Sequence, residues 1–336
     1  MRQRWLLPIL VVVPLMRVLA AAPADPVLRG PTMGLVFDSS QSALRPIRGI
    51  PGAATLGEPV NLGFAIASAA VSPRQDYALA WKADDSSLVL VRAGGAEISS
   101  AAVAGTRSAP ALIVFSPDGA AAALYDSASG RVQILTGLPD AATVQGDIDV
   151  SALAGPVAAL AVDDAGTSLL LAAGEAETVS LYRITMDAAP QFLASFRSVA
   201  ALRLLDSGRQ ALLADSIAGA LYLIRDLPGA AAIEMIASAR DGLGAPIAVE
   251  ADSAGRRIFL ADREGNLTIL DRERGSVSSL PCGCAPAGLF RLSGTATFRL
   301  TEPSDAPMWV LDASGPDPRI VAIPPGAPQA DNGGRQ

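Results

Sequence analysis

The chain has 336 residues, of which 50% are hydrophobic, 18% charged and 4% aromatic, and its formal net charge is −7. This composition suits a globular protein with heavily buried strands and argues against a disordered chain. Histidine is absent, which excludes serine–histidine and cysteine–histidine nucleophile pairs, histidine general bases and nearly all zinc sites within this sequence. Carboxylate chemistry and oxygen-ligated metals such as calcium stay open.

Residues 1–24 are predicted to be a secretory signal peptide. A basic start, "MRQRW", precedes the apolar run "LLPILVVVPLM" and the small residues of "VLAAAPA", which is the pattern of a cleaved leader. An uncleaved anchor is the alternative, although Pro8, Pro14 and Arg17 leave the run short of the roughly 20 residues of a membrane span. We therefore expect a secreted or periplasmic protein with no membrane span after cleavage.

Cleavage after residue 24 would leave 23 basic and 33 acidic residues, a net charge of −10. Phosphate binding needs clustered lysine and arginine side chains that release counterions. The sequence therefore predicts no nucleic-acid partner.

Residues 25–60 contain two predicted strands, "MGLVFDSS" at 33–40 and "ALRPIRGI" at 43–50, followed by the connector "PGAATLGEP" at 51–59. The strand pair looks like the last two strands of the repeated unit that follows, without the first two.

A turn recurs along residues 61–323. "FSPDG" at 115 corresponds to "VSPRQD" at 71, "VDDAG" at 162, "LDSG" at 205, "ADSAG" at 251 and "LSG" at 292, with spacings of 44, 47, 43, 46 and 41 residues. Each turn separates two apolar strands, as in "PVAALAV" and "TSLLLA", and a third and a weaker fourth strand follow. Four strands in roughly 40 to 45 residues are typical of a propeller blade.

The repeat predicts an all-β fold, a β-propeller of six four-stranded blades over residues 61–323. Residues 25–60 would close the ring by completing the last blade, because an open edge strand invites aggregation. A ring of seven blades, with a degenerate N-terminal blade, is the alternative. Residues 324–336, "PPGAPQADNGGRQ", are predicted to be a disordered tail.

The units resemble those of YVTN, NHL and WD-repeat propellers, in which an apolar strand, a turn like "SPDG", a second strand, an Asp-containing turn and a third strand follow one another. The third strands end in "YRI", "IRD" and "LDR" rather than in Trp-Asp, which favours the YVTN and NHL grouping. The resemblance implies the fold and leaves the function open, since such units occur in scaffolds, receptors and enzymes.

Cys282 and Cys284, in "LPCGCAPAG", are the only cysteines. Export favours their oxidation, and a disulfide across Gly283 would stiffen the loop between the last two units. Free or intermolecular thiols, and a redox or metal role, are the alternatives.

Three aspartates, Asp126, Asp215 and Asp262, follow second strands in "LYDSASG", "LADSIAG" and "LADREG". They are predicted to share one face of the ring with the cysteine loop. A ring of carboxylates there would receive a cation or a basic peptide, whereas the simpler interpretation is ordinary turn chemistry.

The predicted inner strands carry one carboxylate, Glu250, and two cations, Arg203 and Arg291. These residues are candidates for the binding face of the ring. The set is small for a metal site, so no catalytic residue, metal ligand or cofactor is assigned.

The sequence therefore predicts an exported, non-catalytic, monomeric β-propeller that acts as a protein- or peptide-binding or scaffold module. The alternative is a propeller hydrolase of the sugar-lactonase type, which would use carboxylates and a divalent cation in the central channel. A purely structural role in the cell envelope is also open.

Overall fold

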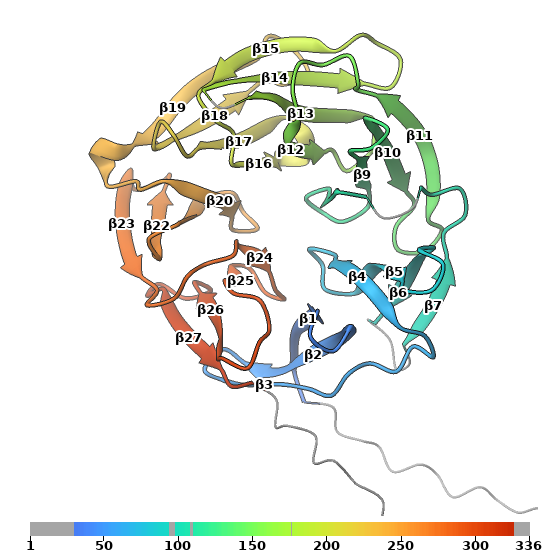
Figure 1. Cartoon of the computed structure of the whole chain (residues 1–336). Helices are drawn as coiled ribbons and strands as arrows, with labels where there is room; N and C mark the ends of the chain where they lie inside the picture. The colour runs from blue at the N-terminus through green and yellow to red at the C-terminus, as the bar shows by residue number, and fades with distance from the viewer. Residues whose placement is uncertain (1–29, 94–97, 108–109, 176, 326–336) are drawn as a thin grey trace, which may run out of the picture. The chain divides into compact units, whose positions relative to one another are not determined.

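Short antiparallel strands make up almost all of the regular structure in the computed structural model of the chain, which describes residues 30–93, 98–107, 110–175 and 177–325. The predicted leader and residues 326–336 of the predicted tail lie outside these residues. Seven sheets follow one another around a ring (Figure 1). Each sheet is one blade, numbered here in chain order.

The first four blades use β1 to β15. Blade 1 contains β1 (Thr32–Asp38), β2 (Ala43–Ile50) and β3 (Ala53–Leu56). Blade 2 contains β4 (Ile66–Val71), β5 (Tyr77–Lys82), β6 (Leu88–Arg92) and β7 (Ser99–Ala102). Blade 3 contains β8 (Leu112–Phe115), β9 (Ala122–Asp126), β10 (Arg131–Thr136) and β11 (Thr143–Asp149). Blade 4 contains β12 (Val157–Val162), β13 (Ser168–Glu175), β14 (Thr178–Thr185) and β15 (Gln191–Phe196).

The last three blades use β16 to β27. Blade 5 contains β16 (Ala201–Leu205), β17 (Gln210–Asp215), β18 (Ala220–Arg225) and β19 (Ala232–Ser238). Blade 6 contains β20 (Pro246–Ala251), β21 (Arg257–Asp262), β22 (Asn266–Asp271) and β23 (Ser276–Pro281). Blade 7 contains β24 (Phe290–Arg291), β25 (Thr297–Arg299), β26 (Met308–Asp312) and β27 (Arg319–Ile323).

Helical structure in the described residues is limited to two short 3-10 helices, η1 (Asp206–Gly208) and η2 (Ala239–Asp241). No helix in this part of the chain is long and apolar enough to cross a membrane.

The prediction of six blades is wrong, because the ring has seven. Residues 32–56 do not complete the last blade: β1 pairs with β2 and β2 with β3 in a sheet of their own. The pair at 33–50 forms the first and second strands of this sheet rather than a third and a fourth, and the predicted connector contains β3. The turn between β1 and β2 lacks the glycine that marks the turns after the first strands of blades 3 to 7; in its place Asp38 accepts hydrogen bonds from the Ser40 and Gln41 N–H groups.

The six repeated units lie where the spacing placed them. The first residue of each recurring turn sequence is the last residue of an inner strand in blades 2 to 6. These residues are Val71, Phe115, Val162, Leu205 and Ala251. The turns that follow favour glycine where the backbone has a positive φ, as at Gly119 (71°) and Gly166 (69°), a region that side chains with a Cβ rarely enter.

Every pair of neighbouring blades encloses its own apolar cluster. Leu212 and Leu213 of β17 show the principle, because Leu212 packs against blade 6 and Leu213 against blade 4. Adjacent residues of a strand point to opposite faces, and here both faces are covered, so the inner strands are apolar without alternation. Met33 and Val36 of blade 1 share a cluster with Val310 of blade 7, which closes the ring.

The strand order fixes which turns lie together. In each four-stranded blade the chain runs from the innermost strand outward, as Figure 1 shows for β20 to β23. Because neighbouring strands are antiparallel, turns between first and second strands gather on one face, called here the first-turn face. Turns between second and third strands, and the links between blades, gather on the opposite face, called the second-turn face.

Candidate functional site

A cavity of about 630 Å³, called here the mouth pocket, lies at the centre of the ring. The innermost strand of every blade contributes to its lining, for example through Ala69–Val71 of β4 and Leu160–Val162 of β12. Ser39, Gln75 and Pro117, which follow first strands, line it as well. The mouth pocket therefore lies where the central channel reaches the first-turn face.

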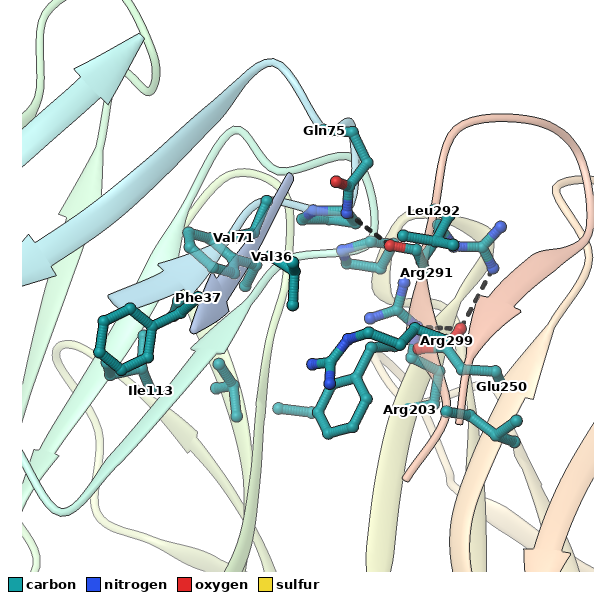
Figure 2. A pocket seen from close by; sticks show the side chains of 18 of the residues that line it. Val36, Phe37, Val71, Gln75, Ile113, Arg203, Glu250, Arg291, Leu292 and Arg299 are labelled. Atoms are coloured by element: carbon teal, nitrogen blue, oxygen red, sulfur yellow. Dashed lines mark hydrogen bonds and ion pairs between the residues drawn. The ribbon is translucent and has the colours of Figure 1, made fainter. Parts of the chain in front are cut away.

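The two sides of the mouth pocket differ in chemistry, as Figure 2 shows. Blades 1 to 3 supply an apolar wall, made of Val36, Phe37, Val71 and Ile113. Blades 5 to 7 supply a charged wall, made of Arg203, Glu250, Arg291 and Arg299. The pocket is thus amphiphilic.

The charged wall is organised around Glu250, because the neighbouring inner strands β16, β20 and β24 bring the three predicted candidates together. Its Oε2 lies 3.3 Å from Arg203 Nε and 3.1 Å from Arg291 Nη2. The side chains of Arg203, Glu250 and Arg291 are 16%, 10% and 14% exposed. One carboxylate therefore faces two guanidinium groups, and the cluster holds a surplus positive charge in a site that water reaches poorly.

Arg299 of β25 adds a second cationic element. Its guanidinium carbon lies 4.1 Å from the centre of the Phe290 ring, and Nη1 donates to the Thr301 carbonyl at 2.8 Å. Nη1 also forms an ion pair with Glu302 at 2.6 Å. Burial lowers the pKa of Arg299, and Glu302 opposes this shift. Phe290 is 39% exposed on the innermost strand of blade 7, so an aromatic face stays open to the pocket.

Gln75 holds the mouth pocket together where the two ends of the ring meet. Its Oε1 accepts the Leu35 N–H of blade 1 at 2.7 Å, and its Nε2 donates to the Arg291 carbonyl of blade 7 at 2.5 Å. Gln75 occupies the place of the turn glycine, with φ of 63°. The sequence analysis did not single out Gln75. The signal that could have found it is the glutamine in "VSPRQD" at the position where "FSPDG" has glycine.

Arg299 and Phe37 were also missed by sequence reasoning. Arg299 belongs to a second strand, and only first strands were considered for the channel. Phe37 belongs to β1, which was not recognised as a first strand.

The three predicted aspartates lie on the second-turn face, away from the mouth pocket. Asp126 accepts the Ala128 N–H at 2.9 Å, Asp215 the Ile217 N–H at 3.0 Å, and Asp262 the Glu264 N–H at 2.9 Å; each fixes its own turn. Hydrogen bonds, led by the one with the Ser129 hydroxyl, lower the pKa of Asp126. Within the described ranges no three acidic or cysteine side chains form a group that could hold a metal ion.

The cysteine loop is on the same face. A disulfide joins Cys282 to Cys284, and the Cys282 N–H donates to the Gly265 carbonyl at 2.7 Å. Gly265 follows Asp262 in the turn between β21 and β22, so the loop packs directly on that turn.

A second cavity, also of about 630 Å³, adjoins the mouth pocket and shares Arg203 and Arg291 with it. Asp118 and Asp164 line it, and the Asp118 N–H donates to Asp164 Oδ1 at 2.9 Å. Burial and a hydrogen bond with Asp118 raise the pKa of Asp164. Burial would raise the pKa of Asp118 too, but its hydrogen bonds, including the one with Asp164, lower it.

These features define a seven-bladed β-propeller with an amphiphilic pocket at one mouth of its channel. No protein-family profile matches the chain, and no curated protein is similar to it in sequence.

Solved structures show the same fold. A functionally unknown protein from Desulfotomaculum acetoxidans DSM 771 has a TM-score of 0.61 at 14% identity, over 88% of this chain and 100% of its own. The protein called "putative 6-phosphogluconolactonase" from Bacteroides uniformis ATCC 8492 has a TM-score of 0.56 at 14% identity, over 87% and 96%. The WD40 repeats of RRP9 have a TM-score of 0.53 at 13% identity, over 80% and 83%. At these identities the similarity establishes the propeller fold, including its likeness to WD-repeat proteins.

Proposed function

We propose that this propeller is a non-catalytic binding module that takes a protein or peptide ligand at the mouth pocket. The observation that supports the proposal is the amphiphilic lining, with the half-open Phe290 ring on the innermost strand. Exposed aromatic and arginine side chains in a concave site are the groups that most often anchor a protein ligand. The absence of histidine agrees with binding rather than acid–base catalysis.

We further propose that the protein is exported and acts as a monomer. Export rests on the leader pattern of residues 1–24. N-terminal sequencing of the protein recovered from the cell envelope should begin close to Asp25. Light scattering on the purified protein should give the mass of one chain.

The binding proposal is tested by affinity capture from envelope extract with two matched variants. Phe290→Ala removes the exposed ring in the mouth pocket. Phe192→Ala removes a ring that is 55% exposed on β15, the outer strand of blade 4. A protein captured by wild type and by the Phe192 variant but not by the Phe290 variant is the expected result. Capture that is equal for all three, or absent, contradicts the proposal.

A hydrolase of the sugar-lactonase type is the second candidate, and the Asp118–Asp164 pair in the second cavity is the observation that favours it. Two carboxyls whose pKa values are pushed in opposite directions are typical of acid–base sites. Glu250 argues against a cation in the mouth pocket, because two guanidinium groups already lie within 3.3 Å of its Oε2. A rise of several degrees in Tm with calcium or magnesium, as ligand linkage requires, together with lactone hydrolysis lost in Asp164→Asn, would favour the enzyme.

A further inference from the structure

We infer that the mouth pocket recognises a carboxylate at the end of an apolar group, with the carboxylate bound by Arg203 and the apolar group held between Phe37 and Phe290. The inference rests on the proposed binding function and specifies the chemistry of the ligand. It follows from the donors, the charge and the shape of the two walls.

Arg203 has the free donors. Its Nε faces Glu250 at 3.3 Å, and within the described ranges neither of its terminal nitrogens makes a hydrogen bond to the protein. Arg291, in contrast, uses Nη2 on the Ala251 carbonyl and on Glu250, and Nη1 on the Thr295 carbonyl. The fork of Arg203 therefore stays available, and a guanidinium fork matches the two oxygens of a carboxylate.

The net charge of the site favours a ligand that carries a single negative charge. Arg203, Arg291 and Arg299 bring three positive charges, and Glu250 and Glu302 bring two negative ones. The three arginine side chains and Glu250 are 16% exposed or less, whereas Glu302 is 53% exposed. The surplus positive charge therefore lies on largely buried side chains. A buried charge without a partner is unfavourable, and a monoanionic carboxylate would balance it, whereas a dianionic phosphate would overshoot.

The apolar wall favours a ligand whose remaining part is apolar. Val36, Phe37, Val71 and Ile113 are brought together by the innermost strands of blades 1 to 3, and Figure 2 shows them across the pocket from the arginines. Phe290 lies on the charged side with its ring covered on one face by Arg299. A ligand whose carboxylate reaches Arg203 would lay the atoms next to that carboxylate against these side chains.

Two sources present this chemistry, the C-terminal end of a peptide with an apolar last residue and a free amphiphilic acid. Fluorescence anisotropy separates them with labelled Gly-Ser-Gly-Val-Leu, its C-terminal amide, and octanoate as a competitor. We expect the peptide acid to bind the purified protein at least tenfold more tightly than the amide, because the amide carries no charge and offers one oxygen in place of the two that the guanidinium fork matches.

The variants test Arg203 directly. Arg203→Met should weaken binding of the peptide acid at least tenfold and leave the weak binding of the amide unchanged. Because this change leaves Glu250 short of one partner, the double variant Arg203→Met/Glu250→Gln provides a form with no added negative charge in the site. Arg225→Met is the matched control, since Arg225 forms an exposed pair with Glu234 on the outer strands of blade 5.

Each outcome decides the inference. Binding of the peptide acid that is lost with Arg203 supports it with a peptide as the source. Displacement or saturable binding by octanoate alone, lost with Arg203, supports the carboxylate site and contradicts the peptide function proposed above. Equal binding of acid and amide, no binding of either probe, or unchanged binding in both folded Arg203 variants overturns the inference, while partner capture through Phe290 would still uphold the binding function.

Discussion

The side-chain amide of Gln75 donates to the backbone carbonyl of Arg291 at 2.5 Å, across 216 residues of sequence. The same side chain accepts the Leu35 N–H at 2.7 Å. One residue of blade 2 thus joins blade 1 to blade 7 at the seam where the ring closes. A non-glycine residue with φ of 63° is uncommon, and the contacts that Gln75 makes give a physical reason for it.

Gln75→Ala is expected to destabilise the ring by about 2–6 kcal/mol, because it leaves the Leu35 N–H and the Arg291 carbonyl without their partner and each such group costs about 1–3 kcal/mol. Urea unfolding measures the loss. Gln145→Ala, at an exposed position of β11, is the control and should change stability by less than about 0.5 kcal/mol. Equal effects of the two substitutions would show that the seam does not depend on Gln75.

Gly34→Ala should act through Gln75. A Cβ at Gly34 would collide with the Gln75 side chain, and φ at Gly34 is 153°. In the Gln75→Ala background that collision disappears, so Gly34→Ala should cost less there, with a coupling free energy of about 1 kcal/mol or more. A double-mutant cycle by urea unfolding measures the coupling, and strict additivity would refute the contact.

Arg45→Met should destabilise the protein by about 3–5 kcal/mol at pH 7, because it leaves the buried Asp38 carboxylate without its guanidinium. The two groups lie 2.9 Å apart with side chains 6% and 3% exposed. The exposed pair lost in Arg225→Met should cost no more than about 1 kcal/mol. Urea unfolding compares the two variants, and similar losses would mean that burial does not strengthen the Asp38 pair.

The same pair predicts a pH dependence. Burial alone would raise the pKa of Asp38, but hydrogen bonds from Ser40, Arg45 and the backbone hold it below its ordinary value of 3.8. A folded pKa below the unfolded one gives stability that is present above pH 3.8 and is lost as the pH falls through the folded pKa. The gap between wild type and Arg45→Met should therefore shrink at acid pH. A gap that is constant from pH 7 to below pH 3 would contradict this assignment.

Glu250→Gln should lower stability and strengthen carboxylate binding at the same time. The change leaves two guanidiniums together with no carboxylate between them, which should cost about 3–5 kcal/mol. Removing the negative charge beside Arg203 should tighten binding of the peptide acid about tenfold or more, because the ligand carboxylate would no longer be repelled by Glu250. Unfolding and anisotropy measure the two effects, and weaker binding would show that Glu250 contacts the ligand itself.

Loss of the disulfide should have a small effect. Cys282 and Cys284 are two residues apart, and closing so short a loop restricts the unfolded chain by about 1.5 kcal/mol. Unfolding of the Cys282→Ser/Cys284→Ser variant, compared with oxidised wild type, checks the value. A loss above about 3 kcal/mol would show that the bridge fixes the packing of its loop on the Gly265 turn.

The repeated turns and strands could be predicted from the sequence, because their backbone conformation or burial strongly favours one kind of residue. Gly119 and Gly166 mark turns with positive φ, and the apolar runs before them mark strands covered on both faces, so the repeat was visible without a structure. Blade 1 has no such turn: its first two strands meet at Asp38, and the chain carries no glycine there. Its position in the ring follows from packing between residues far apart in the sequence, such as Met33 against Val310.

The site was predictable to the same extent. Arg203, Glu250 and Arg291 were found because a charged side chain in an apolar inner strand is conspicuous. Gln75 and Arg299 were not, because their part in the pocket depends on how blades 1, 2 and 7 meet. The turn aspartates, such as Asp215, carry a strong sequence signal whose cause is local backbone geometry, and the structure places them on the other face.

A crystal structure of the protein with Gly-Ser-Gly-Val-Leu tests the central claim most directly, that the channel mouth on the first-turn face is an amphiphilic carboxylate site. The account predicts the C-terminal carboxylate within hydrogen-bond distance of the terminal nitrogens of Arg203, with the leucine side chain against Phe37 or Phe290. A peptide bound on the second-turn face beside Asp215 and Asp262, or with its carboxylate in solvent, would contradict it.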